Sequence, residues 1–209
     1  MKMAYSVVIA EDYKMARDVF AATVEDSELF TLAAVFNTAY EAMDWFEHNT
    51  ADLVLMDVLI PGSINGISAA KIIKERSPAT KIIIVTSMPE ISYIDRAKAV
   101  GAESFWYKEL QEQPLLELMT RTVNGESIYP AQSPVVQFGS TLSSELTGRE
   151  KSVLRELVDG RSNKEIAEKL GIAENTVKMN ITNMLTKTGY KSRLELALKA
   201  RHLGLVIRD

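Results

Sequence analysis

Within the first 108 residues of this 209-residue chain, five residues with ionisable or hydroxyl side chains stand at the ends of short, mostly apolar segments. They are Glu11, Asp12, Asp57, Thr86 and Lys108. Crowded carboxylates repel one another, and a divalent cation relieves that repulsion. Oxygen ligands with room for water suit Mg²⁺. A metal-bound carboxylate beside an ammonium group is equipped to accept a phosphoryl group as an aspartyl phosphate.

Asp57 is the best candidate for the phosphoryl acceptor. It directly follows an apolar segment and precedes a Pro61-Gly62 turn that should leave it exposed. Lys108 and Thr86 would hold the phosphoryl oxygens, Lys108 as a point charge and Thr86 as a hydrogen-bond donor. Any one of these residues alone would be read as a solvated strand end. The prediction therefore depends on their convergence at one edge of a sheet.

Five short segments rich in β-formers must supply that sheet. They are Tyr5–Ala10, Phe30–Phe36, Asp52–Met56, Lys81–Val85 and Glu103–Tyr107. Three of them are nearly continuous apolar runs, which is typical of parallel strands covered on both faces.

Helical patterns alternate with these strands. They cover Lys14–Val24, Tyr40–His48, Ile67–Arg76, Ile91–Val100 and Leu115–Val123. The alternation predicts an α/β fold, a doubly wound, flavodoxin-like sheet of five parallel strands. Ligands of such sheets lie beyond the carboxyl ends of the strands, where the polar residues stand.

The charge distribution divides the chain. Residues 1–144 hold 11 Lys and Arg against 19 Asp and Glu, a net charge of −8, whereas residues 145–209 hold 13 against 9, a net charge of +4. The acidic part suits a metal ion and the basic part suits phosphates. Residues 126–144 are rich in Ser, Thr and Pro and read as a linker. The predicted organisation is a domain at 1–125, a linker at 126–144 and a second domain at 145–209.

The second domain reads as all-helical. Three segments of the S/T-x-x-E type, which begin at Thr147, Ser162 and Ser192, predict capped helix starts. The longest predicted helix is Glu174–Thr188, and the short turn Leu170-Gly171-Ile172 before it is typical of a helix-turn-helix.

The two faces of Glu174–Thr188 differ in character. Apolar residues recur at helical spacing and form a predicted inward stripe, namely Val177, Ile181, Met184, Leu185 and Thr188. The outward residues are then Asn175, Lys178, Met179, Thr182 and Thr186. Amide, ammonium and hydroxyl groups read base edges, and a methyl-bearing side chain can meet a thymine methyl. Taken alone, such a face would be read as that of a solvated polar helix, although its groups are also those that a DNA-reading helix needs.

Residues 1–125 resemble the receiver domains of two-component response regulators. The matching segments are Glu11-Asp12, Leu53–Gly62, Thr86-Ser87 and Gly101–Lys108. The resemblance implies that Asp57 takes a phosphoryl group from a partner sensor histidine kinase. It implies that Glu11, Asp12, Asp57 and the backbone carbonyl of Leu59 bind Mg²⁺, and that Phe105 is an aromatic residue that rotates on activation. Two departures are the loop glycine, Gly66, which comes one residue later than usual, and Glu109, which replaces a common proline.

Residues 146–193 resemble the LuxR-type helix-turn-helix, and the whole chain is similar to the NarL/FixJ response regulators. The matching segments are Leu146–Glu150, Gly160–Ala167, Leu170–Ile172, Thr176–Lys178 and Lys191–Arg193. The resemblance makes Lys178, Met179 and Thr182 base-facing and makes Thr176, Lys187 and Arg193 phosphate contacts on DNA. It also implies a homodimer formed on phosphorylation.

Three alternatives stay open at this point. A Mg²⁺-dependent phosphohydrolase on a similar fold would usually need an acidic residue two positions after Asp57, where Leu59 stands. A DNA-binding regulator that is independent of phosphorylation, and a pure protein-interaction module, are the others. The absence of cysteine excludes disulfides, no apolar segment reaches the ~18 residues that span a bilayer, and a cytoplasmic, non-membrane protein is expected.

Overall fold

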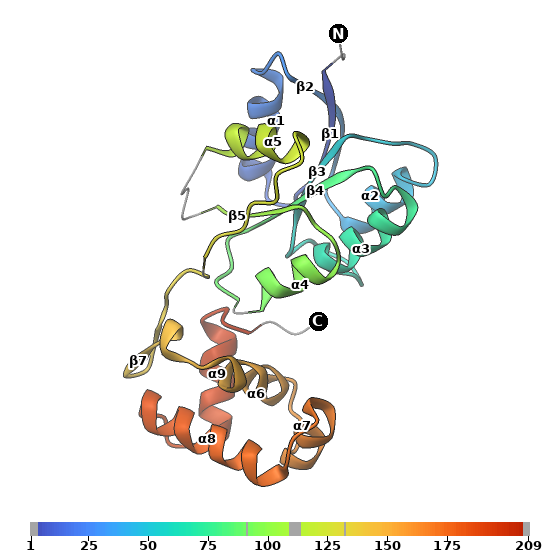
Figure 1. The fold of residues 1–209 in the computed structure, drawn as a ribbon. Coiled ribbons are helices and arrows are strands. Elements are labelled where there is room, and N and C mark those ends of the chain that lie inside the picture. Colours follow the sequence, from blue (N-terminus) through green and yellow to red (C-terminus); the bar gives the residue numbers. More distant parts are fainter. Residues whose placement is uncertain (1–3, 91, 109–113, 132, 207–209) are drawn as a thin grey trace. The chain divides into compact units, whose positions relative to one another are not determined.

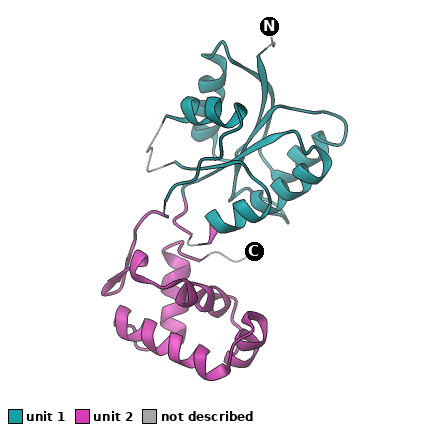
Figure 2. Cartoon of the chain, viewed as in Figure 1, with its two compact units in different colours: residues 1–87, 94–131 teal, residues 88–93, 132–209 magenta. Residues whose placement is uncertain are grey.

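The computed structural model describes residues 4–90, 92–108, 114–131 and 133–206. The chain divides into two compact units (Figure 2). Unit 1 contains residues 1–87 and 94–131, and unit 2 contains residues 88–93 and 132–209.

Unit 1 is built on a parallel five-stranded sheet with the order β2-β1-β3-β4-β5. Its strands are β1 (Tyr5–Ala10), β2 (Phe30–Phe36), β3 (Leu53–Asp57), β4 (Lys81–Thr86) and β5 (Ser104–Tyr107). The strand order reverses between β1 and β3, so a crevice is expected at the carboxyl ends of these two neighbours. The predicted doubly wound α/β sheet is confirmed.

The helices of unit 1 cover both faces of this sheet (Figure 1). They are α1 (Lys14–Glu25), α2 (Ala39–Trp45), α3 (Gly66–Arg76), α4 (Tyr93–Ala99) and α5 (Leu115–Val123). Helices α1 and α5 lie on one face, and α2, α3 and α4 lie on the other. The first residue of the predicted helix Ile91–Val100 lies outside the described residues.

The hydrophobic core of unit 1 lies on both faces of the sheet, because successive side chains of a strand point to opposite faces. Alternate strand residues such as Ile9, Leu55 and Ile83 are fully buried against α1 and α5, together with Phe20 and Leu118. The intervening residues of the same strands are equally buried on the other face. Since both faces are apolar, the sheet is rigid and the strand ends are held at fixed positions.

Unit 2 is mainly helical, as predicted. Its helices are α6 (Gly148–Val158), α7 (Asn163–Leu170), α8 (Glu174–Thr188) and α9 (Arg193–His202). The capping boxes at Thr147 and Ser162 are both formed. At Ser192 the hydroxyl accepts the N–H of Glu195, but the Glu195 carboxylate turns to the N–H of Lys191 at 2.8 Å, so the reciprocal half of that box is missing.

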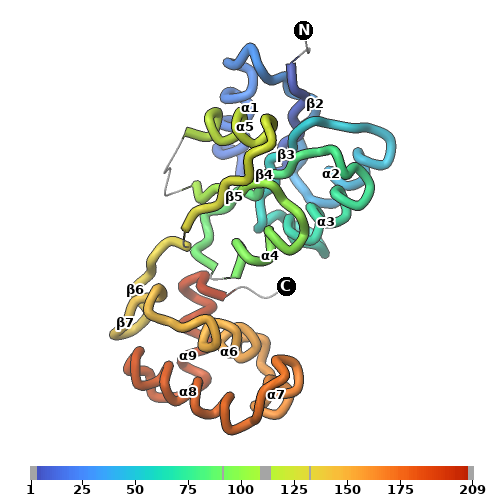
Figure 3. The backbone as a smooth tube through the Cα atoms, viewed as in Figure 1, coloured from blue at the N-terminus to red at the C-terminus, as the bar shows by residue number. Residues whose placement is uncertain are grey.

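A short hairpin precedes these helices, at residues that the sequence reads as linker. Strands β6 (Gln137–Phe138) and β7 (Thr141–Leu142) pair antiparallel, and a 3₁₀ turn follows at Ser143–Glu145 (Figure 3). Phe138 is fully buried in the core of unit 2 and its ring centroid lies 5.3 Å from that of Tyr190. Residues 126–131 belong to unit 1.

Residues 88–93, between β4 and α4 in the sequence, belong to unit 2. Glu90 is fully buried and pairs with Arg155 of α6 at 3.1 Å, and Ser133 donates to the Glu90 carbonyl at 3.3 Å.

Among the described residues, no helix combines the length and the apolar character needed to cross a membrane.

Candidate phosphoryl-transfer site and DNA-reading helix

Three carboxylates converge at the carboxyl edge of the sheet. Glu11 and Asp12 follow β1, and Asp57 is the last residue of β3, the neighbouring strand. One ligand oxygen from each lies within 4.8 Å of the others. Glu11 and Asp57 are buried, whereas Asp12 is exposed. The arrangement offers oxygen ligands only, with one side open to water, and this donor set fits Mg²⁺.

Lys108 lies against two of these carboxylates. Its Nζ is 2.6 Å from Oε2 of Glu11 and 3.0 Å from Oδ2 of Asp57. Burial, and next the charge of Asp57, raise the pKa of Glu11 to about 7 against the opposing pull of Lys108. Burial would lower the pKa of Lys108, but the two carboxylates outweigh it and raise that pKa. Lys108 Nζ thus lies within 3.0 Å of two buried carboxyl groups, and burial opposes the charged form of Glu11.

Backbone pairing positions Thr86 and Phe105. Thr86 is the buried last residue of β4, and its carbonyl accepts the N–H of Lys108 at 3.0 Å. Phe105 pairs with Ile84 and Tyr107 pairs with Thr86, so all four side chains share one face of the sheet. Phe105 is buried, with its ring centroid 4.9 Å from that of Tyr107.

The loop between β3 and α3 passes very close to Asp57. A Cβ at Gly66 would stand 1.8 Å from the Asp57 carbonyl oxygen, so only glycine fits there. Asn65 caps α3 by accepting the N–H of Ser68 at 3.0 Å. Leu59, whose carbonyl is a predicted ligand, lies two residues after Asp57, and its N–H is 3.4 Å from Asp57 Oδ1. The extra residue of this loop is thus accommodated before a normally capped helix.

Helix α8 has the two faces that its sequence predicts. Val177, Ile181 and Met184 are buried, and Gly171 ends α7 in the left-handed conformation that the turn requires. The predicted base-facing residues Lys178, Met179 and Thr182 are exposed. Thr176 is half-buried, and its carbonyl accepts the amide of Asn180 at 2.7 Å.

Two predicted phosphate contacts are engaged within unit 2. Lys187 lies 2.8 Å from Oε2 of the buried Glu150 and 3.1 Å from the carbonyl of Glu145. Arg193 donates to Asn163 Oδ1 at 3.0 Å and to the carbonyl of Arg161 at 2.7 Å. Both cations therefore tie elements of unit 2 together in this structure.

Comparison with known proteins finds two separate family matches along the chain. Residues 7–120 match the response regulator receiver domain, and residues 144–200 match the family of bacterial regulatory proteins, luxR family. The transcriptional regulatory protein YhcZ of Bacillus subtilis is 35% identical over 208 residues, covering 93% of this chain and 94% of its own. The chain is a NarL/FixJ-type response regulator.

Two further likenesses agree with this assignment. The nitrate/nitrite response regulator NarL of Escherichia coli K12 is 25% identical over 92% of this chain and 93% of its own. In fold, the regulator resembles RcsB of Salmonella enterica serovar Typhimurium bound to promoter rprA in the presence of the phosphomimetic BeF₃⁻, with a TM-score of 0.62, 21% identity, and coverage of 93% of this chain and 97% of that one. The protein is thus a two-component response regulator that controls transcription.

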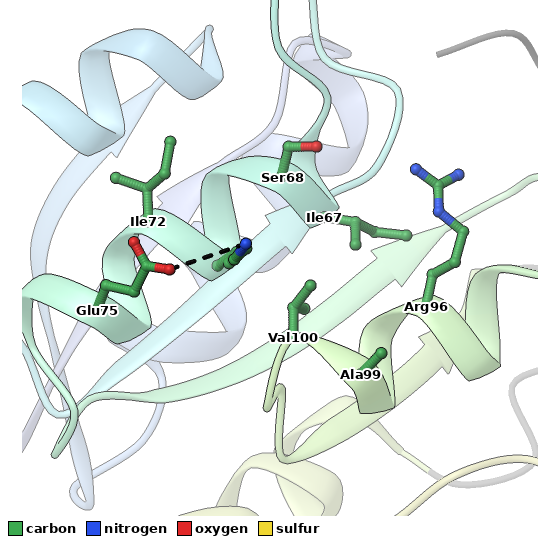
Figure 4. Close-up of a pocket in the computed structure, with 8 residues that line it drawn as sticks. Ile67, Ser68, Ile72, Glu75, Arg96, Ala99 and Val100 are labelled. Carbon is green, nitrogen blue, oxygen red and sulfur yellow. Dashed lines mark ion pairs between the residues drawn. The ribbon is translucent and has the colours of Figure 1, made fainter.

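The response regulator also carries a groove of about 400 Å³ between α3 and α4 (Figure 4). Ile67, Ile72 and Val100 line it with apolar side chains, and Arg96 and the ion-paired Lys71 and Glu75 line it as well. None of the residues predicted from the sequence to form a site lines this groove.

Sequence reasoning missed the partner of Lys187. Glu150 was expected only as a capping residue of α6, and it does accept the N–H of Thr147 at 2.7 Å. The same oxygen also accepts Lys187. A sequence signal for this second contact is lacking, because the two residues stand 37 positions apart.

Proposed function

We propose that Asp57 accepts a phosphoryl group from a partner sensor histidine kinase, and that this controls homodimerisation and sequence-specific DNA binding. The observation that carries the proposal is the cluster of Glu11, Asp12 and Asp57 with Lys108 Nζ 3.0 Å from Asp57. A solvated loop edge would not bury two carboxylates and a lysine together.

In the proposed transfer, a carboxylate oxygen of Asp57 forms a bond to phosphorus while the bond from phosphorus to the kinase imidazole nitrogen breaks. The imidazole leaves with that electron pair. Lys108 compensates the charge of the transferred oxygens and Thr86 donates its hydroxyl to one of them. Glu11, Asp12, Asp57 and the Leu59 carbonyl would hold Mg²⁺, which neutralises charge on the phosphoryl oxygens when bound.

The phosphoryl group adds charge and acceptor oxygens at the end of β4. Rotation of Thr86 toward those oxygens vacates space on the sheet face that it shares with Phe105. Phe105 can then repack, and the surface of α4, β5 and α5 changes with it. A local charge event is in this way converted into a change of surface shape.

Exposed apolar side chains supply candidate dimer surfaces. On α1, Met15 and Val19 are 67% and 61% exposed, and α5 beside it exposes Leu116 (Figure 1). On α9, Leu194 and Leu198 are 66% and 58% exposed at i and i+4, which places them on one helix face. We assign α1 and α5 to contact between receivers, and α9 to contact between helix-turn-helix domains on DNA. RcsB, which shares this fold, is described as dimers bound to DNA.

Helix α8 is the proposed reader of the DNA major groove. Lys178, Met179 and Thr182 face the bases in this proposal, and Thr176 faces the backbone. Lys187 and Arg193 could reach phosphates only by exchanging the internal partners described above.

The test of phosphorylation uses acetyl phosphate and Mg²⁺ followed by intact mass measurement. The wild type should gain one phosphoryl group, and Asp57→Asn should gain none. Asp44→Asn, at an exposed position of α2, is the matched control and should behave as the wild type. Full phosphorylation of Asp57→Asn would refute the assignment of the acceptor.

The test of control by phosphorylation compares protein with and without beryllofluoride. Light scattering should show a change from monomer to dimer, and affinity for specific DNA should rise. A dimer that binds specific DNA equally well in Asp57→Asn would instead support the phosphorylation-independent regulator. The phosphohydrolase is not favoured, because the half-buried Leu59 occupies the position of its general acid.

A further inference from the structure

The exposed face of α8 differs from a generic DNA-binding surface in carrying almost no net charge. Its exposed side chains include Glu174, Asn175, Lys178, Met179, Thr182, Asn183 and Thr186. The ammonium of Lys178 and the carboxylate of Glu174 lie 3.0 Å apart and cancel one another. The rest of the face is neutral, made of amides, hydroxyls and a thioether.

We infer that α8 recognises an A·T-rich half-site, in which thymine methyl groups and adenine edges carry most of the sequence discrimination and Lys178 specifies at most one guanine. This inference rests on the proposed function, namely that α8 reads DNA. It goes further because it names the base composition of the target from this chain's own residues.

Helix geometry places four neutral side chains of α8 in line with one another. At 100° per residue, Asn175, Met179, Thr182 and Thr186 lie within one narrow stripe, since they stand at i, i+4, i+7 and i+11. Lys178 lies at one flank of this stripe. The groups that first meet the base pairs are therefore an amide, two threonines and a methionine, and the cation lies to the side.

The chemical groups of this stripe match those that bind A·T pairs. An Asn amide pairs in bidentate fashion with adenine N6 and N7, and apolar groups contact the thymine methyl. Met179 is 57% exposed and presents its thioether methyl. The hydroxyl of Thr186 donates to the carbonyl of Thr182 at 3.0 Å, which uses its proton within the helix and leaves its methyl group and lone pairs for other contacts.

Helix α8 offers few groups that could read guanine. Guanine is read chiefly by bidentate Arg or Lys at O6 and N7. Helix α8 contains no arginine, and its lysines are Lys178 and Lys187. Lys187 is half-buried on Glu150, on the side of the helix that packs inward. Only Lys178 is therefore placed to read a guanine, and a G·C-rich site would leave the neutral stripe without partners.

The experiment has two arms with full-length protein treated with beryllofluoride. In the first arm, binding sequences are selected from randomised duplex DNA. In the second arm, the selected site is remade with uracil for thymine, which deletes the methyl, or with 7-deazaadenine for adenine, which deletes the N7 acceptor. The affinity for each analogue duplex is measured with the wild type, with Met179→Ala and with Asn175→Ala. Thermal unfolding of each variant verifies the fold.

We expect A·T-rich half-sites with one conserved G·C pair. Uracil should weaken binding by the wild type roughly three- to fivefold at the contacted thymine, as deletion of one methyl predicts, and should cost Met179→Ala nothing there. Loss of N7 at the contacted adenine should cost the wild type roughly fivefold or more and Asn175→Ala nothing.

Two results would overturn the inference, and they are distinguishable. A G·C-rich selected site, or analogue penalties that are the same in the variants, would mean that this face does not read A·T pairs, although sequence-specific binding itself stands. A selection that enriches no sequence, with equal affinity for selected and random duplexes, would refute the proposed DNA-reading function and the inference together.

Discussion

The replacement Lys187→Ala tests whether this lysine stabilises unit 2 or serves DNA. The side chain of Glu150 is 3% exposed and that of Lys187 is 34% exposed, with 2.8 Å between the charged atoms. Breaking a fully buried ion pair costs ~3–5 kcal/mol, whereas an exposed pair is worth ~0–1 kcal/mol. Because water reaches Lys187 but not Glu150, we expect a loss of ~1–3 kcal/mol of unfolding free energy.

Thermal unfolding followed by circular dichroism measures this loss. For a domain of this size, ~1 kcal/mol lowers the Tm by about 4–8 °C. Trp45 and Trp106 both lie in unit 1, and they are the two tryptophans of the chain, so their fluorescence follows unit 1 and should not shift. Lys164→Ala, an exposed lysine near the start of α7, is the matched control and should leave the Tm nearly unchanged.

The pH dependence supplies a second readout. Burial would raise the pKa of Glu150, but hydrogen bonds from Lys187 and Thr147 outweigh it and hold the pKa below the ordinary 4.5. A lowered carboxyl pKa stabilises the fold above the unfolded pKa, and that stability is lost as the pH falls through the folded pKa. The difference between wild type and Lys187→Ala should therefore be full above pH 4.5 and shrink at lower pH. An unchanged Tm, together with weaker binding to specific and random DNA alike, would show that Lys187 meets phosphates instead.

Three further predictions concern helix ends, a close contact and a dimer surface. Ala173 is the N-cap residue of α8 and offers no side-chain cap. Ala173→Ser should therefore raise the unfolding free energy of unit 2, measured by urea denaturation, by ~1 kcal/mol. No gain would mean that the first backbone N–H groups of α8 already have partners. Gly66→Ala should abolish phosphorylation by acetyl phosphate and shift the unfolding transition that is followed by tryptophan fluorescence. Gly148→Ala, which has open space around it, should do neither. Normal phosphorylation of Gly66→Ala would contradict the close contact. Leu198→Glu should weaken binding to paired half-sites about tenfold but not to a single half-site, and equal losses on both in a gel-shift assay would exclude α9 as a dimer contact.

The sheet and its reactive edge could be predicted because their signals are local and repeated. Strands β1 and β2 have the predicted bounds, Tyr5–Ala10 and Phe30–Phe36, because β-branched and aromatic residues favour the strand conformation. Once parallel pairing is granted, Glu11, Asp57 and Lys108 must meet, because the carboxyl ends of parallel strands share one edge. The prediction that these residues lie close together therefore needed only the parallel pairing of the strands.

The hairpin at 137–142 and the loop contact at Gly66 could not be predicted in the same way. Each strand of the hairpin is two residues long, too short for an alternating pattern, and Phe138 reads as one apolar residue in a polar segment. Its burial depends on Tyr190, more than fifty positions away. At Gly66, the glycine itself was visible in the sequence, but the oxygen that excludes a Cβ belongs to Asp57 across the loop.

Three lysines show what decides whether a cation binds structure, phosphate or DNA. Lys108 faces two carboxylates and is itself largely buried, so in the proposed function its positive charge would also compensate the charge of a phosphoryl group on Asp57. Lys187 faces one carboxylate, Glu150, that is 3% exposed. If Lys187 moved away, the buried charge of Glu150 would have lost its cation. Lys178 faces a carboxylate that is 46% exposed, so water could solvate Glu174 if Lys178 left it for a base, as we propose. In the proposed DNA complex, we therefore expect the exposure of the partner carboxylate, rather than that of the lysine, to decide which of these lysines can leave its partner for DNA.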